Sequence, residues 1–236
     1  MHTGELLGSG RTADVFAIDD RWVLRQYRDG GDAAPEAAVM SYLADHGYPV
    51  PRLRRPTAHG DTAVARTRLE MQRLTGPSMV TALEQGAITP EAAGAMLADL
   101  LRRLHAIPAR LSADPADRLL HLDLHPENVM LMPDGPMVID WSTADEGRPG
   151  LDWAMSALIL AEVAVAPVAV AEGARIGLTS LLRHADPGVR LGDAGSGHLA
   201  RARTRRAADP HLTESEVRLL GDAVALVHEV EAGIRR

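Results

Sequence analysis

Three polar side chains lie close enough in the sequence to do chemistry together: Asp123, Asn128 and Asp140. The amide follows the first acid by five residues, and the second acid follows the amide by twelve. The oxygens of Asn128 and Asp140 suit a hard cation such as Mg²⁺, which prefers one or two carboxylates together with phosphate oxygens. Asp123 would then accept the proton of a hydroxyl group. The pattern predicts metal-assisted chemistry at a hydroxyl.

The residues around these side chains predict the elements that position them. We expect Asp123 to lie on a short loop that leaves a helix, and the amide to begin a strand over residues 129–132. A turn at residues 133–135 leads into a second, β-branched strand over residues 137–139. Asp140, at the end of that strand, would then lie close to Asp123 and Asn128.

The same residues resemble the catalytic motifs of a known family. His121, Asp123 and Asn128 match the pattern H-x-D-x-x-x-x-N, and residues 139–141 match I-D-[FW]. The sequence is similar to the aminoglycoside phosphotransferase and choline kinase-like family of small-molecule kinases. Asp123 would be the catalytic residue of such an enzyme, with His121 bracing the loop around it.

The resemblance implies an α+β, bilobal protein-kinase-like fold. Residues 1–74 would form the nucleotide-binding lobe, a small antiparallel sheet with one helix. Residues 75–236 would form a mainly helical lobe for catalysis and acceptor binding. Two strands are expected near residues 53–59 and 62–70, and a capping box at residues 213–216 predicts the start of the last helix.

The first lobe carries the residues that the family uses to bind the nucleotide. The glycine-rich loop, whose backbone N–H groups approach phosphate oxygens, is matched by Gly8, Ser9, Gly10 and Val15. Ala13 stands in place of the third glycine of that loop. Met71 and Arg73 fall where the family has its hinge, whose backbone receives the adenine.

A third strand is predicted at residues 22–27, where Val23 and Arg25 share a face. The family places a lysine where Arg25 stands, paired to a helix glutamate and reaching the phosphates. Glu36, in a helix that Pro35 begins, is the corresponding partner. Arginine keeps the positive charge and can bind phosphate through two N–H groups of its guanidinium, although it is not equivalent to lysine. The alternative is an arginine on the surface of the strand.

Departures from protein kinases indicate a small-molecule acceptor. Leu122 replaces the arginine that reads a phosphorylated activation loop, and His125 fits the small-molecule branch. Asp152, which the family bonds back to the catalytic loop, follows Asp140 by only twelve residues. That distance leaves no room for a long segment that docks a peptide, so residues 142–149 are expected to rim a small-molecule pocket.

Composition limits the other possibilities. The chain has 236 residues, 46% of them hydrophobic, which allows one large or two small domains with a proper core. It has no cysteine, which excludes a disulfide scaffold, a thiol nucleophile and cysteine-ligated zinc. The net charge of −7 is concentrated in residues 76–180, which hold 14 acids and 6 arginines. This argues against a nucleic-acid partner and favours a cationic acceptor, although solubility alone would also explain it.

The predicted activity is transfer of the γ-phosphoryl group of ATP, or of GTP, to a hydroxyl of a small molecule with Mg²⁺ as cofactor. The alternative is a nucleotide-binding pseudokinase with a regulatory role, supported only by Arg25 and the missing third glycine. The arginine-rich residues 201–206 are interpreted as a solvated helix face. The longest apolar run, residues 154–171, is broken and short for a membrane span. We expect a cytoplasmic protein, with no prediction of its oligomeric state.

Overall fold

The computed structural model describes residues 4–10, 12–28, 30–54, 66–192 and 197–236. The chain forms two compact units. The first comprises Met1–Pro77 and Met130–Ser142, and the second comprises Ser78–Val129 and Thr143–Arg236. The segment that carries Asp140 therefore groups with the first unit, whereas the sequence-based division assigned it to the second lobe. A functional boundary at residue 74 stays a prediction.

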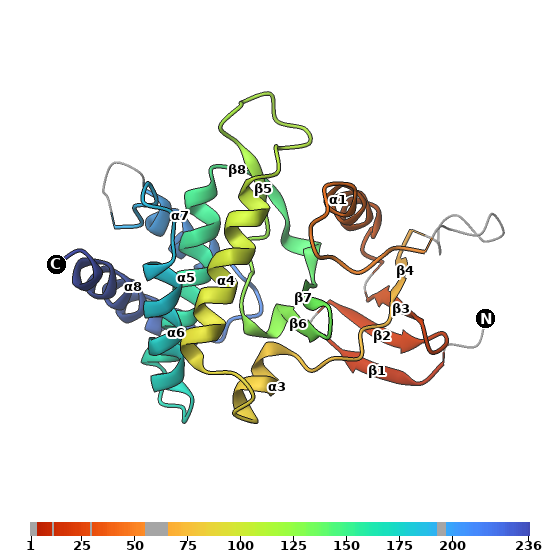
Figure 1. Ribbon diagram of the computed structural model, residues 1–236, viewed down its shortest axis with the longest axis horizontal. Coiled ribbons are helices and arrows are strands. Elements are labelled where there is room, and N and C mark those ends of the chain that lie inside the picture. The colour runs from red at the N-terminus through yellow and green to blue at the C-terminus, as the bar shows by residue number, and fades with distance from the viewer. Residues whose placement is uncertain (1–3, 11, 29, 55–65, 193–196) are drawn as a thin grey trace. The chain divides into compact units, whose positions relative to one another are not determined.

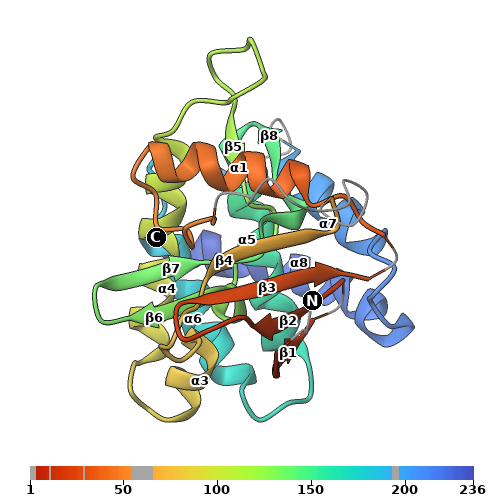
Figure 2. The same ribbon diagram turned by 90° about the vertical axis from the view of Figure 1, so that its right-hand side faces the viewer.

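The first unit contains an antiparallel sheet in the order β1-β2-β3-β4 (Figure 2). The strands are β1 (Leu6–Ser9), β2 (Ala13–Ala17), β3 (Trp22–Tyr27) and β4 (Arg68–Gln72). On β3, Val23 and Arg25 are both buried, as the alternation of a strand predicts. The third strand and its buried face are confirmed.

Helix α1 (Ala34–Asp45) lies beside this sheet (Figure 2). Its first turn contains Pro35, and the Asp32 carboxylate accepts a hydrogen bond of 3.0 Å from the N–H of Ala34. The helix buries Val39, Met40 and Leu43. The predicted helix is confirmed, and its buried apolar residues hold Glu36 within the unit.

Two predicted strands near residues 53–70 are only partly testable. Leu53 forms an isolated antiparallel bridge with Met71, and the following strand begins at Arg68. Residues 55–65 carry most of the predicted strands and their turn, and they lie outside the described residues.

A hairpin of β6 (Val129–Met132) and β7 (Gly135–Val138) follows the catalytic loop. The second strand begins two residues earlier than predicted and ends one residue earlier, so Ile139 lies beyond it. Asn128 precedes the hairpin in a short 3₁₀ helix, η1 (Pro126–Asn128).

The second unit is mainly helical (Figure 1). Its α-helices are α3 (Met79–Glu84), α4 (Pro90–His105), α5 (Pro149–Val165), α6 (Ala171–Arg183), α7 (His198–Ala207) and α8 (Glu214–Ile234). Helix α5 packs against α6, α7 and α8. It is accordingly buried on nearly every side from Leu151 to Ala161. The α+β architecture with an antiparallel sheet and a helical part is confirmed.

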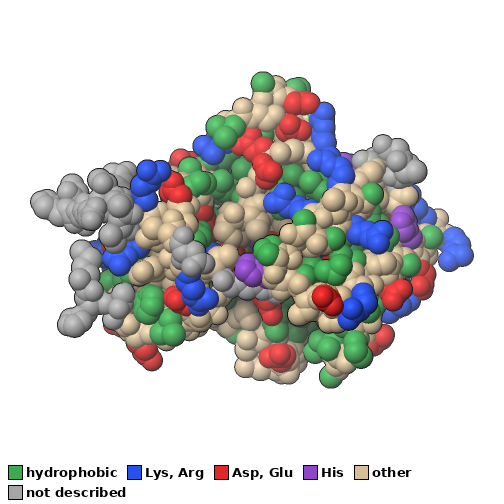
Figure 3. Space-filling view, turned by 180° about the vertical axis from the view of Figure 1, so that it is seen from behind, with side chains coloured by type: hydrophobic (Ala, Val, Ile, Leu, Met, Phe, Trp, Pro, Cys, Tyr) green, Lys and Arg blue, Asp and Glu red, His purple; other side chains and the backbone are tan. Residues whose placement is uncertain are grey.

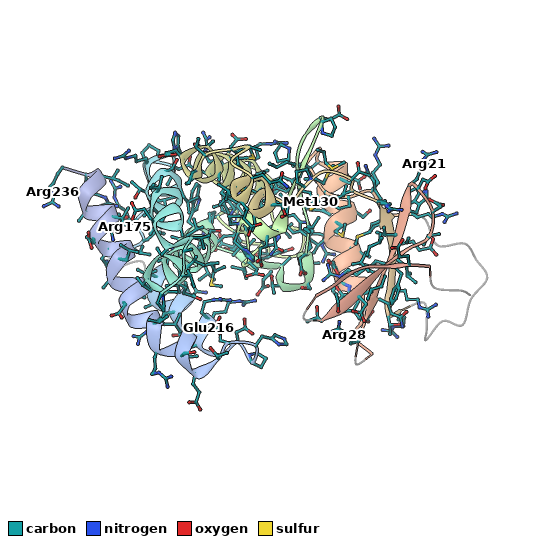
Figure 4. The ribbon with its side chains drawn as sticks, turned by 90° about the horizontal axis from the view of Figure 1, so that it is seen from below. Arg21, Arg28, Met130, Arg175, Glu216 and Arg236 are labelled. Carbon is teal, nitrogen blue, oxygen red and sulfur yellow. The ribbon has the colours of Figure 1, made fainter. Side chains whose placement is uncertain are left out.

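Close packing joins the other helices of this unit. A Cβ atom at Gly94 of α4 would lie 2.2 Å from the carbonyl oxygen of Gly177 on α6, so only glycine fits at that crossing. Helix α8 extends between the labelled Glu216 and Arg236 in Figure 4. Arg175 of α6 forms an ion pair of 2.7 Å with Glu229 of α8.

Helix starts in this unit follow sequence signals. The hydroxyl of Thr89 accepts from the N–H of Ala92 at the start of α4, and Thr213 with Glu216 forms the predicted capping box of α8. None of the helices described is both long enough and apolar enough to cross a bilayer. Acidic and basic side chains are intermixed over the face drawn in Figure 3.

The element before Asp123 is a strand, which corrects the predicted helix. Strand β5 (Arg118–Leu120) pairs antiparallel with β8 (Asp145–Gly147), and its last residue immediately precedes His121. A strand of three residues is too short to show the alternation of apolar and polar residues that predicts a strand. Its partner strand also lies 25 or more residues away in the sequence.

Candidate active site

The backbone of the catalytic loop is held by one buried carboxylate. Asp152, at the start of α5, accepts hydrogen bonds from the N–H of His121 at 2.9 Å and from the N–H of Leu122 at 2.7 Å. Leu122 has a φ of 63°, in the left-handed region that costs a non-glycine residue about 1–3 kcal/mol. The two hydrogen bonds offset that cost and fix the direction in which the chain enters Asp123.

His105 completes the contacts of Asp152. Its Nε2 atom lies 3.0 Å from Asp152 Oδ2, and both side chains are buried. Burial opposes ionisation of Asp152, but the hydrogen bond and charge of His105, with the charge and N–H of His121, outweigh it and lower its pKa. The family role of Asp152, bonding back to the loop, is confirmed, and His105 is a packed partner rather than a catalyst.

His121 braces the loop from within. Its Nδ1 atom accepts a hydrogen bond of 3.2 Å from the N–H of Asp123. Its carbonyl oxygen accepts a hydrogen bond of 2.8 Å from the hydroxyl of Thr143. His121 is fully buried, in keeping with the predicted structural role.

Asn128 is oriented by Asp123. Its Nδ2 atom donates to the carbonyl oxygen of Asp123 at 2.8 Å and to Asp123 Oδ2 at 3.2 Å, and it lies 3.2 Å from His125 Nε2. Because the amide nitrogen is committed to Asp123, the amide oxygen is the atom that Asn128 offers to a cation.

Asp123 is partly exposed and ionised at neutral pH. Its side chain is 30% exposed, and His125 Nε2 lies 3.6 Å from Oδ2, too far for a strong hydrogen bond. Burial raises the pKa of Asp123, but His125, His121 and Arg206 together lower it below the ordinary value. Asp123 thus combines access for a ligand with a stable negative charge.

The first unit holds a second buried cluster around Arg25. Arg25 Nη1 contacts Glu36 Oε1 at 3.0 Å, and Nη2 contacts Asp140 Oδ1 at 2.8 Å. Glu36 also accepts from the N–H of Trp141 at 3.1 Å and from the Tyr27 hydroxyl. Arg25 and Glu36 are 7% and 4% exposed, so the alternative of a surface arginine is wrong.

Charge and burial set the protonation of this cluster. Burial lowers the pKa of Arg25, but the charges of Glu36 and Asp140 outweigh it, so the pKa lies above its ordinary value. Burial and the neighbouring Glu36 raise the pKa of Tyr27, which keeps the phenol protonated as a donor. Arg25 is therefore a permanent cation bridging two carboxylates.

Asp140 is held at a second left-handed position. Its φ is 61°, and the hydroxyl of Ser142 donates to its Oδ1 atom at 2.6 Å. Ser142 and Arg25 thus meet the same oxygen, which fixes the rotamer of the carboxylate.

The glycine turn lies next to Arg25 across the sheet. Gly8 pairs with Val15, and Val15 pairs with Arg25, so the three residues form a row across β1, β2 and β3. A Cβ atom at Gly8 would meet no atom within 4 Å, which leaves the space over this backbone open to a ligand. The hydroxyl of Ser9 donates to Asp14 at 2.7 Å. The turn itself closes through a 2.9 Å hydrogen bond from the N–H of Gly10 to the carbonyl of residue 13.

The predicted hinge residues lie at the end of β4. Met71 pairs with Val23 on β3. The N–H of Arg73 donates to the carbonyl of Arg21 at 2.8 Å, and its guanidinium contacts the carbonyl of Asp19 at 3.3 Å. Adenine recognition by this segment stays a prediction, and the Arg73 side chain has a local structural partner.

The structure brings together two sets of predicted residues. Asp123 and Asn128 meet in the second unit, and Arg25, Glu36 and Asp140 meet in the first. Because Asn128 and Asp140 belong to different units, their binding of one metal ion stays a prediction.

Several contributing residues were missed by sequence reasoning. These are Tyr27, Ser142, Thr143 and Arg206. Tyr27 could have been found, because it follows Arg25 by two residues on a strand and so shares its face. Residues 201–206 were predicted to form a solvated helix face. That prediction is wrong for Arg206, whose side chain is only 11% exposed.

Comparison with solved structures agrees with this fold. The aminoglycoside phosphotransferase APH(2'')-Ib bound to ADP is 12% identical, with 97% of this chain and 95% of that chain covered and a TM-score of 0.55. A choline/ethanolamine kinase family protein from Mesorhizobium loti is 15% identical, with 98% and 92% covered and a TM-score of 0.57. The amicoumacin kinase hAmiN, in complex with AMP-PNP, Ca²⁺ and Ami, is 13% identical, with 97% and 88% covered and a TM-score of 0.56.

A search of curated proteins returned no match. The model of the phosphotransferase enzyme family matches residues 3–118 and 106–190. These ranges include the glycine turn, Arg25, the catalytic loop and Asp140. With most of its length matched, the chain belongs to the phosphotransferase enzyme family.

Proposed function

We propose that this protein transfers the γ-phosphoryl group of ATP or GTP to a hydroxyl group of a small molecule. The observation that supports this most directly is the braced loop that presents an ionised, partly exposed Asp123 beside Asn128. A regulator that only bound nucleotide would not require this carboxylate.

Asp123 would orient the acceptor hydroxyl and take its proton. Its pKa lies below the ordinary value, so it is a weak base that is ionised at neutral pH. A weak base suits phosphoryl transfer through a loose transition state, in which catalysis comes mainly from positioning and charge stabilisation. The acceptor proton would accordingly move to Asp123 late in the reaction.

The donor groups suit a divalent cation such as Mg²⁺. The orientation of Asn128 leaves an amide oxygen for the metal, and Asp140 supplies a carboxylate held by Arg25 and Ser142. Both are hard oxygen ligands. Bound with the nucleotide, the cation would neutralise charge on the phosphate oxygens.

Arg25 and the glycine turn are proposed to hold the phosphates. We expect Arg25→Ala to lower nucleotide affinity roughly tenfold to a hundredfold, because a hydrogen bond to a charged group contributes about 1.5–3 kcal/mol. Isothermal titration calorimetry with the Mg²⁺ complexes of ATP and GTP would measure this.

The matched control is Arg21→Ala, because Arg21 is exposed on the turn before β3 (labelled in Figure 4). It should bind nucleotide as the unmodified protein does. Loss of the buried partner of Glu36 also lowers stability, so the fraction of folded protein must be measured beside affinity. Unchanged affinity in folded Arg25→Ala would contradict the assignment.

A hydroxylated cation is the proposed acceptor class. Residues 76–180 carry 14 acids against 6 arginines, and a negative field attracts a cationic ligand. Two of the similar structures are complexes with such small molecules: APH(2")-IIa with gentamicin, and the amicoumacin kinase hAmiN with Ami. Aminoglycosides, peptide antibiotics, choline and hydroxylated amines are therefore the first acceptors to test.

The decisive experiment is a phosphoryl-transfer screen over such compounds with ATP and with GTP. Formation of a product heavier by one phosphoryl group, detected by mass spectrometry, is expected with the unmodified protein. The Asp123→Asn variant is the control. Normal nucleotide binding with no acceptor phosphorylated would favour the regulatory alternative.

A further inference from the structure

Arg206 is a largely buried charge within an exposed arginine run. Arg201, Arg203 and Arg205 of α7 are exposed, whereas the side chain of Arg206 is 11% exposed. Arg206 Nε and Nη2 contact both carboxylate oxygens of Glu162 on α5, at 3.0 and 2.8 Å. This paired geometry is the strongest form of an arginine–carboxylate contact.

A second carboxylate completes the contacts of Arg206. Its Nη1 atom lies 3.3 Å from Asp209 Oδ2, just beyond α7. Burial lowers the pKa of Arg206, but Glu162, Asp123 and Asp209 outweigh it, so the pKa lies above its ordinary value. A buried ion pair seldom stabilises a fold more than apolar side chains of similar size would. Arg206 thus fixes the end of α7 against α5.

Arg205 links the same helix end to that loop. Its Nη2 atom contacts the carbonyl oxygen of Thr143 at 3.3 Å. The hydroxyl of Thr143 donates to the carbonyl oxygen of His121, whose Nδ1 accepts from the N–H of Asp123. Three successive contacts therefore connect α7 with Asp123, independently of Asp152.

We propose that Arg205, Arg206 and Thr143 position the catalytic loop, with α7 acting as a clamp that Glu162 anchors. They are positioning residues, because none is placed on the substrate. The inference rests on the proposed role of Asp123, and it adds a helix outside the catalytic motifs to the machinery that orients this carboxylate. Arg206 would act by anchoring α7 to α5 through Glu162, and Thr143 through the hydrogen bond to His121.

The first test removes the hydroxyl contact. Thr143→Val should lower kcat roughly tenfold to a hundredfold, because small displacements of a reacting group are costly, while the KM for nucleotide changes little. Thr143→Ser, which keeps the hydroxyl, should restore kcat. Because a loss of folded protein would also lower the apparent kcat without changing KM, kcat is calculated from the folded fraction, and rescue by serine assigns the effect to the hydroxyl. Full activity of Thr143→Val would overturn this part.

The second test removes the ion pair that anchors α7 without leaving Glu162 unpaired. The double variant Arg206→Met with Glu162→Met replaces the ion pair by apolar side chains, a change that proteins often tolerate. Arg203→Gln on the exposed face of α7 is the control, because it changes a charge of the same helix and leaves this ion pair intact.

The readout of this test is independent of activity. Amide hydrogen exchange of Asp123, whose N–H donates to His121 Nδ1, should be faster in the double variant and unchanged in Arg203→Gln when no nucleotide is present. An unchanged exchange rate in the double variant would overturn the role of Arg206. If the unmodified protein phosphorylates no acceptor, the proposed function fails, yet the exchange measurement still decides whether α7 holds the loop that carries Asp123.

Discussion

Asp123→Asn is expected to lower turnover by roughly 10²–10⁴, the usual contribution of a general acid–base group. Asparagine keeps the size of the side chain and an oxygen for the Asn128 amide, which now donates to Asp123 Oδ2 at 3.2 Å. It removes the negative charge that orients the acceptor and takes its proton. Single-turnover measurements with the best acceptor from the screen would record the loss.

Two further variants separate catalysis from binding. Asp123→Asn should bind the Mg²⁺–nucleotide complex normally, because Asp123 is not a proposed metal ligand, whereas Asp140→Ala should bind it more weakly. Glu127→Gln, an exposed acid on η1, should leave turnover unchanged. If turnover survived Asp123→Asn and fell in Glu127→Gln, the catalytic residue would have been wrongly assigned.

Local sequence signals predicted most elements of the fold. The alternating pattern over residues 22–27 predicted β3, Pro35 predicted the start of α1, and the capping box predicted α8. Each signal depends on neighbours within a few residues. The strand β5 was missed because its three residues are stabilised by β8, a partner much later in the chain. Elements that exist only through such distant pairing leave little trace in a local pattern.

Predicted contacts are confirmed where a motif sets the geometry. Arg25 pairs with Glu36 as expected, and Asp152 bonds to the catalytic loop as the family motif implies. The contact of Arg25 with Asp140 was not foreseen, because 115 residues separate the two. Arg206 was misread, because its neighbours in the run are exposed while Glu162, its partner on α5, lies 44 residues earlier. Tertiary pairing of this kind decides which charges are buried.

Asp152→Ala is expected to destabilise the protein by about 3–5 kcal/mol, the usual cost of breaking a buried charged contact. The substitution removes the carboxylate that accepts hydrogen bonds from the N–H groups of His121 and Leu122 and that contacts the His105 side chain. Asp152 is fully buried, so water cannot replace it. Leu122 would also lose the hydrogen bond that offsets its positive φ. Urea unfolding should show a lower midpoint with an unchanged slope.

The pH dependence of this loss identifies its cause. The pKa of Asp152 is lower in the folded protein than its ordinary value, because His105 and His121 outweigh burial. Ionised Asp152 therefore stabilises the folded protein at pH values above the pKa that this residue has in the unfolded chain. That stabilisation is lost as the pH falls through the pKa that Asp152 has in the folded protein. The stability difference between the unmodified protein and Asp152→Ala should accordingly be largest near neutral pH and shrink in acid.

Asp99→Ala, which breaks only an exposed pair with Arg102 on α4, should change stability by less than about 1 kcal/mol at every pH. An Asp152→Ala loss that stayed constant into strong acid would assign the effect to packing rather than to the carboxylate charge.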